Sequence, residues 1–370
     1  MAAESVTVRP YEAADRDGFL SLYHTVWGHP KGRDWFAWRF ERNPYRDGVQ
    51  MVVAEADGEV VGVEPLLPFR LRAGATTVDA YQPVDWLVHP DFRRQGIFTR
   101  MTEALLERYA GTAALLFNFP NDALLPGLEG HGWRLVGEVP SRYRLQNPER
   151  LVSSRADALP GAVATLARAG SAFERLERLL DRTVGVPADA SVSRVDGVAA
   201  GDLAERYAAS PPARIHVPRE EAFLSWRYGN PRWETETYLA SRDGEPAAGV
   251  VAATERVRGA TCTHLVDVQP MDAPECADAL RALLAAVVRD HRDVDLLRAP
   301  AGLYARVFRR FWFLADTSFP FSRVATTSRL AIRPLASRDE GADGSLRKLG
   351  GRRLTDPDEW LLLPGDLDIE

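Results

Sequence analysis

The sequence contains very little lysine and cysteine. Lys31 and Lys348 are the only lysines among 370 residues, so 44 arginines carry nearly all of the positive charge. Any contact to a phosphate group must therefore come from arginine or from backbone amides. Cys262 and Cys276 are the only cysteines, and they do not form a metal-binding pair. This usage is typical of buried free thiols in a reducing compartment.

Long apolar runs and metal-binding patterns are also lacking. The longest apolar runs, such as Ala282–Val288, are far shorter than the about 18 residues of a membrane-spanning helix. The N-terminus has no charged segment followed by an apolar one, so we see no secretory leader. The seven histidines do not show the i, i+4 spacing of a zinc-binding helix. We therefore expect a cytoplasmic protein with no metal site and no membrane association.

The charge balance is slightly acidic. There are 46 basic and 52 acidic residues, which gives a net charge of −6, and 45% of the residues are hydrophobic. An acidic balance argues against a broad nucleic-acid surface, so we expect no nucleic-acid partner. At about 100–200 residues per domain, the length predicts two globular domains.

The sequence contains an internal repeat. Four groups of residues recur in the same order at offsets of 182 to 188 positions. Ser5-Val6-Thr7 returns as Ser191-Val192-Ser193, Trp38-Arg39-Phe40 as Trp226-Arg227-Tyr228, Asp57-Gly58-Glu59 as Asp243-Gly244-Glu245, and Val84-Asp85 as Val266-Asp267. The pattern predicts a tandem duplication.

Each copy predicts the same order of elements: a strand, two helices, a hairpin, a further strand and a helix. The hairpin turns Asp57-Gly58 and Asp243-Gly244 are strong signals because both central positions tolerate positive φ. We expect a first domain at 1–150, a helical linker at 151–188, a second domain at 189–335 and a tail at 336–370.

The segment Val84–Met101 carries the most informative chemistry. It predicts a strand, a tight loop and the start of a helix, with Gly96 allowing a ligand to approach the backbone closely. The amides of Arg94–Thr99 lie at a helix N-terminus, which favours an anion such as a pyrophosphate. The segment matches neither GxxxxGK[ST] nor GxGxxG.

These residues resemble a known family. The pattern Val88-x-Pro90-x-x-Arg93-x-x-Gly96-Ile97 is similar to the acyl-CoA loop of the GCN5-related N-acetyltransferases (GNAT). Phe98 departs from the family pattern, which usually has Gly or Ala at that position. The resemblance covers about residues 4–145, and about 190–332 through the repeat alone. It implies an α/β fold with mixed sheets, in two tandem domains, and acetyl-CoA as co-substrate.

The resemblance also implies the cofactor contacts. The backbone of Leu87 and Val88 would pair with the pantetheine arm, and Arg93 would brace the loop or lie near a phosphate. Asn118 or Asn121 would supply a polar contact near the thioester or the pantetheine. The loop that would hold the pyrophosphate consists of Arg94, Gln95, Gly96, Ile97, Phe98 and Thr99.

Asp85 is the candidate catalytic residue. Its carboxylate would accept the proton of the amine, directly or through water, or would bind a cationic acceptor; the alternative is a structural aspartate. Gln82 stands roughly where other members have a glutamate base, and glutamine cannot act as a base. The family's usual tyrosine acid is replaced by Leu128, and we favour a surface position for His131.

Other conspicuous residues have simpler interpretations. The aromatic stripe Trp35, Phe36, Trp38 and Phe40 could line an acceptor pocket, but core packing is the favoured interpretation. Arg39 and Arg227 recur beside a tryptophan in both copies, which indicates a shared structural role such as a buried ion pair.

The second copy lacks the loop chemistry. Val268 is followed by Gln269–Glu275, which contains two prolines, two acidic residues and no Arg-x-x-Gly. We therefore expect a degenerate copy that binds no CoA, and a first copy that transfers an acetyl group to a primary amine by direct attack in a ternary complex.

Two alternatives stay open: an acyl-CoA sensor or scaffold without turnover, and a Fem-like aminoacyl transferase. The acceptor is a small molecule or a peptide amine, and the sequence leaves the acyl chain length and a homo-oligomer open.

Overall fold

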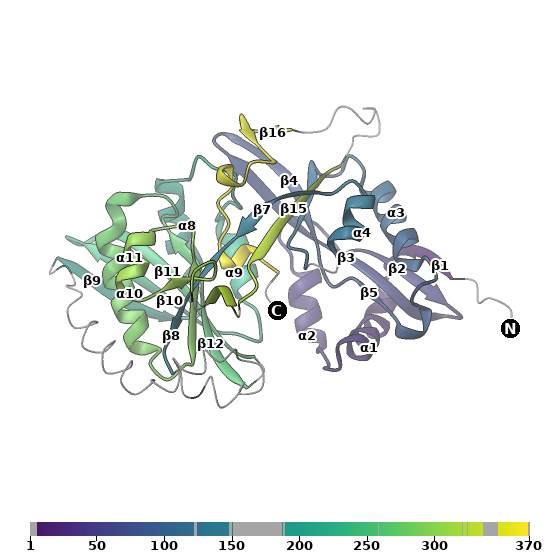
Figure 1. Cartoon of the computed structure of the whole chain (residues 1–370), viewed down its shortest axis with the longest axis horizontal. Coiled ribbons are helices and arrows are strands. Elements are labelled where there is room, and N and C mark those ends of the chain that lie inside the picture. Colours follow the sequence, from purple (N-terminus) through teal and green to yellow (C-terminus); the bar gives the residue numbers. More distant parts are fainter. Residues whose placement is uncertain are drawn as a thin grey trace. The chain divides into compact units, whose positions relative to one another are not determined.

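The computed structural model describes residues 6–121, 124–147, 150, 187, 189–257, 259–319, 321–323, 325–335 and 347–368. The chain forms two compact units (Figure 1). The first unit consists of Met1–Gly137 and Leu330–Glu359, and the second of Glu138–Arg329 and Trp360–Glu370. The proposed boundaries at 150, 188 and 335 stay a prediction. The expected linker helix, 162–182, lies outside the described residues.

The first unit is built on a mixed sheet. Its strands follow the order β1-β2-β3-β4-β6-β15-β7, and the short strand β5 pairs with β3. The bounds are β1 Thr7–Pro10, β2 Gln50–Ala56, β3 Glu59–Ala73, β4 Thr76–Pro83, β5 Leu87–Val88, β6 Leu115–Asn118, β7 Arg134–Val139 and β15 Ser328–Pro334. A small hairpin of β16 (Lys348–Leu349) and β17 (Arg352–Arg353) follows.

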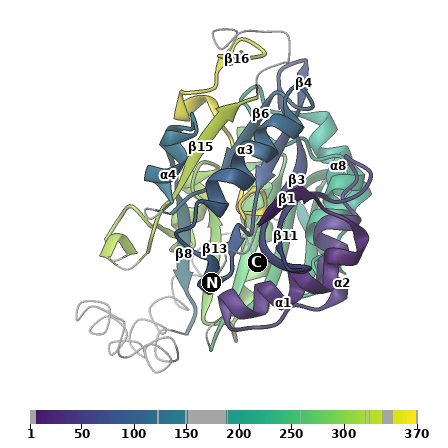
Figure 2. The same ribbon diagram turned by 90° about the vertical axis from the view of Figure 1, so that its right-hand side faces the viewer.

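Helices cover both faces of this sheet (Figures 1 and 2). One face carries α1 (Arg16–Trp27) and α2 (Arg33–Phe36), which continues as a π-helical turn over Ala37–Glu41. The other face carries α3 (Ile97–Tyr109) and α4 (Leu125–Gly130). Gly62 permits α3 to pack closely on the sheet, because a Cβ at Gly62 would lie 3.0 Å from the Met101 sulfur in α3.

The aromatic stripe is core. Trp35, Phe36, Trp38 and Phe40 are each 3% exposed or less, which confirms the interpretation as packing rather than an open acceptor pocket. Phe19 of α1 packs edge-on against Phe36 and Phe40, with ring centroids 5.1 and 5.4 Å apart. Edge-to-face pairs of this kind add to the stabilisation from buried area.

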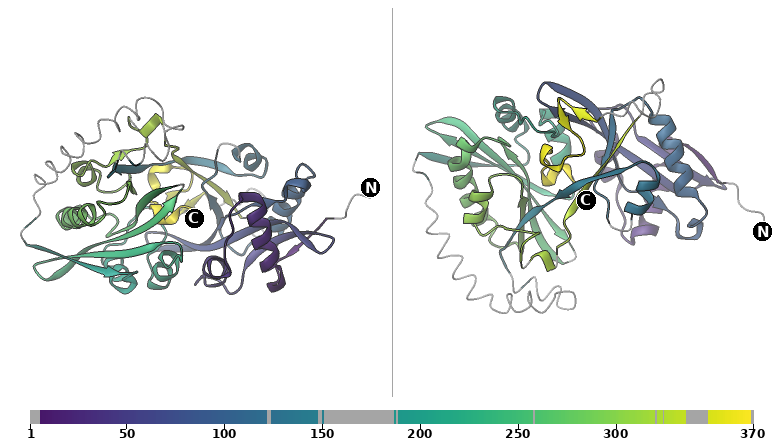
Figure 3. Two further views of the ribbon diagram at one scale, coloured as in Figure 1. Left: turned by 90° about the horizontal axis from the view of Figure 1, so that it is seen from below. Right: turned by 45° about the horizontal axis from the view of Figure 1, so that its top comes forward.

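The second unit repeats the arrangement. Its sheet has the order β14-β8-β13-β12-β11-β10-β9. The bounds are β8 Ser141–Leu145, β9 Ala190–Asp196, β10 Glu234–Arg242, β11 Glu245–Val257, β12 Ala260–Gln269, β13 Leu296–Pro300 and β14 Leu314–Ala315. This sheet lies between α8 (Ala200–Ala209) and α9 (Glu221–Tyr228) on one side and α10 (Ala277–Asp290) and α11 (Ala305–Arg310) on the other (Figure 3).

The duplication is visible in the turns. Asp57 and Gly58 have φ of 50° and 82°, and Asp243 and Gly244 have 52° and 85°. The same two-residue hairpin turn therefore joins β2 to β3 and β10 to β11, as the Asp-Gly pairs predicted.

Each sheet also takes a strand from the other half of the sequence. β15, which ends the second copy, pairs with β6 through Ala331 and Asn118. β8, which follows the first copy, pairs with β13 through Tyr143 and Arg298. The sequence did not predict this exchange, because a strand's partner is set by tertiary packing rather than by local pattern.

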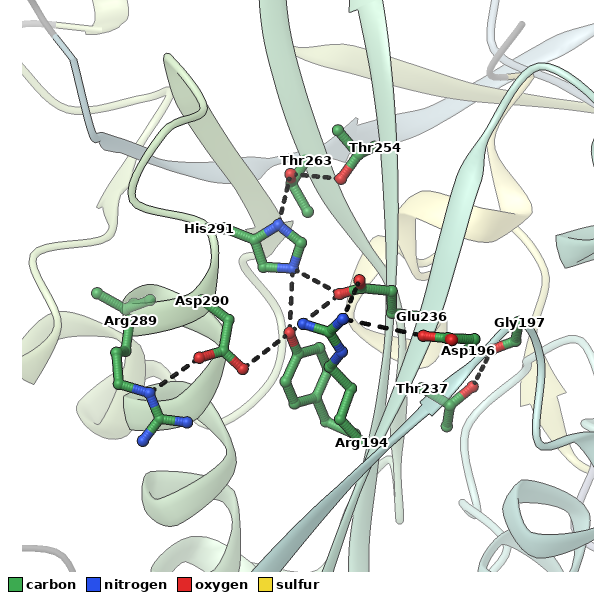
Figure 4. Close-up of polar contacts among 12 residues, drawn as sticks. Arg194, Asp196, Gly197, Glu236, Thr237, Thr254, Thr263, Arg289, Asp290 and His291 are labelled. Carbon is green, nitrogen blue, oxygen red and sulfur yellow. Dashed lines mark hydrogen bonds and ion pairs between the residues drawn. The ribbon is translucent and has the colours of Figure 1, made fainter.

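A polar network holds the end of α10 against β10 and β12 of the second sheet (Figure 4). The Tyr238 hydroxyl donates to Glu236 Oε2 at 3.0 Å and to Asp290 Oδ2 at 3.3 Å. The ring of His291 contacts Glu236 through Nε2 at 3.4 Å, and its Nδ1 lies 3.2 Å from the hydroxyl of Thr263. Within the described chain, no helix is long and apolar enough to cross a membrane.

Candidate functional site

The central strands of the first sheet separate at the site that the sequence singled out. β4 and β6 pair in parallel only at Ala80–Leu115 and Tyr81–Leu116. Beyond this point the chain continues as β5, which pairs with β3, and Val88 lies opposite Gly62. The further strand that the repeat predicts before the loop is therefore not continuous: β4 ends at Pro83, and Asp85 takes a positive φ of 46° before β5 begins. The break leaves Leu87 and Val88 beside diverging strands.

The loop after β5 exposes backbone donors at the start of α3. Gly96 is the N-cap residue with φ 73°, and no side chain caps the first turn. A Cβ built at Gly96 meets no atom within 4 Å, so the space in front of the loop is open. The first amides of a helix have no intrahelical partner and attract negative charge. The loop has the geometry of an anion site.

The arginines around this loop have distinct roles. Arg93 Nε donates to the backbone oxygen of Val88 at 3.2 Å, so Arg93 braces the loop. Arg100 donates to the backbone oxygen of Val6 and lies exposed in the first turns of α3. Arg94 is exposed with φ 61°, and Gln95 Nε2 donates to Asp91 O at 3.2 Å.

Phe98 is part of an aromatic cluster. Its ring centroid lies 5.5 Å from that of Trp86 and 6.2 Å from that of His131. Trp86 in turn contacts Trp133, at 6.5 Å. The residue that departs from the family pattern therefore packs between the loop and the end of α4. The neighbouring loop residues are Ile97, which is buried in the core, and Thr99, which is exposed.

The two candidate asparagines bond locally. Asn118, the last residue of β6, accepts a bond from the Phe119 amide at 2.6 Å through its side-chain oxygen. Asn121 accepts from the Leu124 amide at 3.0 Å and so supports the turn into α4. Their contacts to a ligand stay a prediction.

Asp85 forms a buried ion pair with Arg39. The Nε of Arg39 lies 2.7 Å from Asp85 Oδ2, with side-chain exposures of 0% and 5%. This confirms a buried ion pair as the structural role of Arg39. The pair joins the aromatic helix to the break between β4 and β5. An arginine at this distance favours the ionised form of a carboxylate.

No proton donor stands at the position of the family's usual tyrosine acid, since that position is Leu128, which is fully buried. Tyr109 and His131 are the candidate donors nearby in the sequence. Tyr109 is 5% exposed, and burial raises the pKa of its hydroxyl. His131 is half-buried at the end of α4, where its backbone oxygen accepts a bond from Arg333 at 2.6 Å.

Sequence reasoning missed Glu64. This residue of β3 is 1% exposed and accepts a bond from the hydroxyl of Thr102 in α3, at 3.1 Å. Burial raises the pKa of Glu64 to about 8, although the Thr102 hydroxyl opposes the rise. The signal was present, since Glu64 is the one charged residue in the apolar stretch Val60–Phe69.

In the second unit, the C-terminal segment of the chain packs against the residues that repeat Asp85 and Arg39. Asp267, the repeat of Asp85, lies 2.5 Å from Arg219, and Arg219 also pairs with Asp366 at 2.8 Å. Arg227, the repeat of Arg39, donates to the Gly365 oxygen at 2.7 Å. The segment is packed tightly, because a Cβ at Gly365 would lie 2.5 Å from the Tyr228 hydroxyl.

The loop of the second copy has no open helix N-terminus like that of Gly96. After β12 the chain continues through Pro270 and a 3₁₀ turn, Pro274–Cys276, into α10. Prolines lack the amide that an anion loop needs, and Asp272 and Glu275 add negative charge. In the described part of the chain, no three His, Cys, Asp or Glu side chains gather in a way that could hold a metal ion.

Comparison with known proteins identifies the class. Residues 7–136 match the family model described as "Acetyltransferase (GNAT) domain". Over these residues the first copy of this chain matches a GNAT acetyltransferase domain. No curated protein matches the sequence.

Solved structures share the fold at low identity. A GCN5-related N-acetyltransferase from Anabaena variabilis is 11% identical with a TM-score of 0.58, over 90% of this chain and 73% of that one. A probable N-acyltransferase from Enterococcus faecalis is also 11% identical, with a TM-score of 0.60 and the same coverage. Eis1 from Mycobacterium abscessus is 14% identical with a TM-score of 0.51, over 90% and 74%. Since each match covers 90% of this chain, the similarity in fold extends well beyond the first copy.

Proposed function

We propose that the first copy transfers an acetyl group from acetyl-CoA to a primary amine of a small molecule or a peptide, in the cytoplasm. The observation that carries the proposal is that two features occur together: the strands β4 and β6 diverge, and the helix that begins after Gly96 has an uncapped N-terminus. The first feature offers backbone groups to a pantetheine arm, and the second offers amides to a pyrophosphate. The GNAT family match supports the same co-substrate.

The residues present fit this co-substrate. Gly96 leaves open space before the loop, and exposed Arg94 lies next to it. Backbone groups of Leu87 and Val88 lie where the arm would pass, and Asn118 lies across the gap on β6. Arg93 holds the loop to β5 through the Val88 oxygen.

The chemistry is a direct acyl transfer. The amine nitrogen attacks the thioester carbonyl, a C–N bond forms, the C–S bond breaks, and the CoA sulfur leaves as a thiolate. For Asp85 we propose the orienting role, because a carboxylate that is paired with Arg39 gains little from taking a proton. Its negative charge would hold the amine on the Arg39 side of the strand break, and water would carry the amine's proton away.

A dedicated acid for the thiolate is not required. A thiol has a pKa of about 8–9, so its thiolate is a competent leaving group near neutral pH. The core positions of Leu128 and Tyr109 agree with departure without such an acid.

The non-catalytic sensor is the second candidate. The observation that favours it is the ion pair of Asp85 with Arg39. If Asp85 serves only to pair with Arg39, the first copy could bind acyl-CoA without catalysing a transfer.

Release of CoA thiol from acetyl-CoA in the presence of small amines and peptides tests the proposal. Amine-dependent release by the native protein, lost in Gly96→Glu, would support acetyl transfer. Saturable binding of acetyl-CoA without release with any amine would favour the sensor.

A further inference from the structure

A second group of reactive side chains lies in the second unit. Thr263 of β12 bonds to His291 at the end of α10, so alternation along the strand places Cys262 and His264 on the opposite face of the sheet. Glu255 of β11 is the cross-strand partner of Cys262, and Arg298 of β13 is the partner of His264. Paired residues of neighbouring strands share a face, so these four side chains form one patch.

The patch contains a cysteine, a histidine and a carboxylate in contact. His264 Nε2 lies 3.1 Å from Glu255 Oε1. Glu255, Cys262 and His264 are 7%, 8% and 7% exposed. Both ring nitrogens of His264 are buried and have no hydrogen-bond partner among the described residues, so the contact of Nε2 with Glu255 is an ion-pair contact. The ring therefore faces a carboxylate that stabilises a proton on it.

The electrostatics favour a charged imidazole. Burial opposes the positive charge, but the neighbouring Cys262 thiol and the Glu255 carboxylate outweigh it and raise the pKa of His264 to about 9. Arg298 lies on the next strand, with its Nε donating to the Ser141 hydroxyl at 3.0 Å, and Tyr143 of β8 borders the patch. Cationic neighbours of this kind stabilise a thiolate.

The arrangement belongs to the second copy alone. The offset between Asp85 and Asp267 places Cys262 at the position of Ala80 and His264 at the position of Gln82. The first copy therefore has neither the thiol nor the imidazole at the corresponding positions.

We propose that Cys262, activated by His264 and Glu255, is a site of oxidation by small peroxides. Transfer of the thiol proton to His264 gives an imidazolium next to a thiolate, and the thiolate attacks one peroxide oxygen. An S–O bond forms as the O–O bond breaks, and His264 returns its proton to the departing hydroxide. The sulfur is oxidised to a sulfenic acid and the peroxide is reduced to water. The low exposure of Cys262 excludes bulky electrophiles but admits a molecule of this size.

Trapping of the sulfenic acid tests the proposal. The folded full-length protein is exposed to hydrogen peroxide, the peroxide is removed with catalase, and the protein is then unfolded in the presence of dimedone, so that access of dimedone does not limit labelling. Adducts on both cysteines are quantified by peptide mass spectrometry. Cys276 is the internal control, because it is more exposed, while burial and Glu275 raise the pKa of its thiol. We expect Cys262 to react about tenfold faster than Cys276.

Two variants separate activation from simple access. His264→Gln should slow labelling of Cys262 about tenfold and leave Cys276 unchanged, and Glu255→Gln should slow it in the same direction. Circular dichroism verifies that both variants fold. The rate for Cys262 relative to Cys276 in the native protein is a readout that needs no variant. Faster labelling of Cys276, or a Cys262 rate that His264→Gln leaves unchanged, would overturn the proposal.

Discussion

Two carboxylates in the first unit are buried in different ways. Asp85 is paired with Arg39, whereas Glu64 accepts a hydrogen bond from the hydroxyl of Thr102. The repeat made a structural role for Arg39 predictable, because Arg39 recurs as Arg227, but it did not identify Asp85 as the partner of Arg39. Glu64 was not predictable in the same way, since its position in an apolar strand does not reveal which face it occupies.

The Asp85–Arg39 pair gives a prediction that separates structure from function. Asp85→Asn leaves the buried Arg39 charge without its carboxylate, so we expect a loss of about 3 kcal/mol in stability and a loss of amine-dependent turnover. The double variant Asp85→Asn/Arg39→Gln removes both charges and should recover much of the stability. Turnover should stay low in the double variant, with acetyl-CoA affinity largely kept. Recovery of turnover together with stability would show that Asp85 is purely structural.

Glu64 predicts a pH dependence of stability. Its pKa is raised to about 8 in the folded protein, so the folded state holds a proton that the unfolded chain loses near its ordinary value of 4.5. The stabilisation is complete below that ordinary value and is lost as the pH rises towards 8. We expect the free energy of unfolding to fall by about 1 kcal/mol per pH unit in this range.

Glu64→Gln removes the titration and should flatten this slope. Denaturant midpoints at pH 6, 7 and 8 measure it for both proteins. Parallel pH profiles of the native protein and the variant would contradict a protonated Glu64.

At the scale of elements, the sequence predicted the hairpin turns but did not predict which strands pair. The Asp-Gly turns and the presence of a loop and a helix after β5 follow from local sequence, whereas the break of the strand after Pro83 does not. The exchange of β8 and β15 does not, because both are short strands whose side chains do not encode their neighbours. The use of the C-terminal segment could not be anticipated either, since the charge of Asp366 alone does not reveal its partner Arg219.

The C-terminal segment is predicted to be a structural part of the second unit. Asp366→Asn removes one of the two carboxylates around Arg219 in a fully buried site, and we expect a loss of about 3 kcal/mol in stability. Asp358→Asn, an exposed change in the preceding turn, is the matched control and should cost less than about 0.5 kcal/mol. Thermal unfolding compares the two. Equal effects would show that the Arg219 cluster does not hold the segment.

At the scale of the whole molecule, one fold occurs twice with different contents. The first copy combines an open loop at Gly96 with diverging strands, and the second combines a proline-containing loop with its own C-terminal segment beside Asp267. The sequence predicted this difference between the two loops, because the loss of the Arg-x-x-Gly pattern and the gain of two prolines are visible without a structure. It did not reveal Glu255, Cys262 and His264 as a cluster, since only strand register brings them together.

The central claim is that one copy, the first, binds the acyl-CoA. Calorimetric titration of the full-length protein with acetyl-CoA and with CoA tests it most directly. Gly96→Glu adds bulk and negative charge to the loop, while Gly96→Asn adds a neutral residue that tolerates positive φ comparatively well and so reports on strain alone. Pro274→Glu adds the same charge to the exposed loop of the second copy.

The account predicts one site per chain, lost in Gly96→Glu, weakened in Gly96→Asn and unchanged in Pro274→Glu. Two sites per chain, or a site that Pro274→Glu removes, would contradict the assignment of binding to the first copy, and no binding at all would contradict the acetyltransferase.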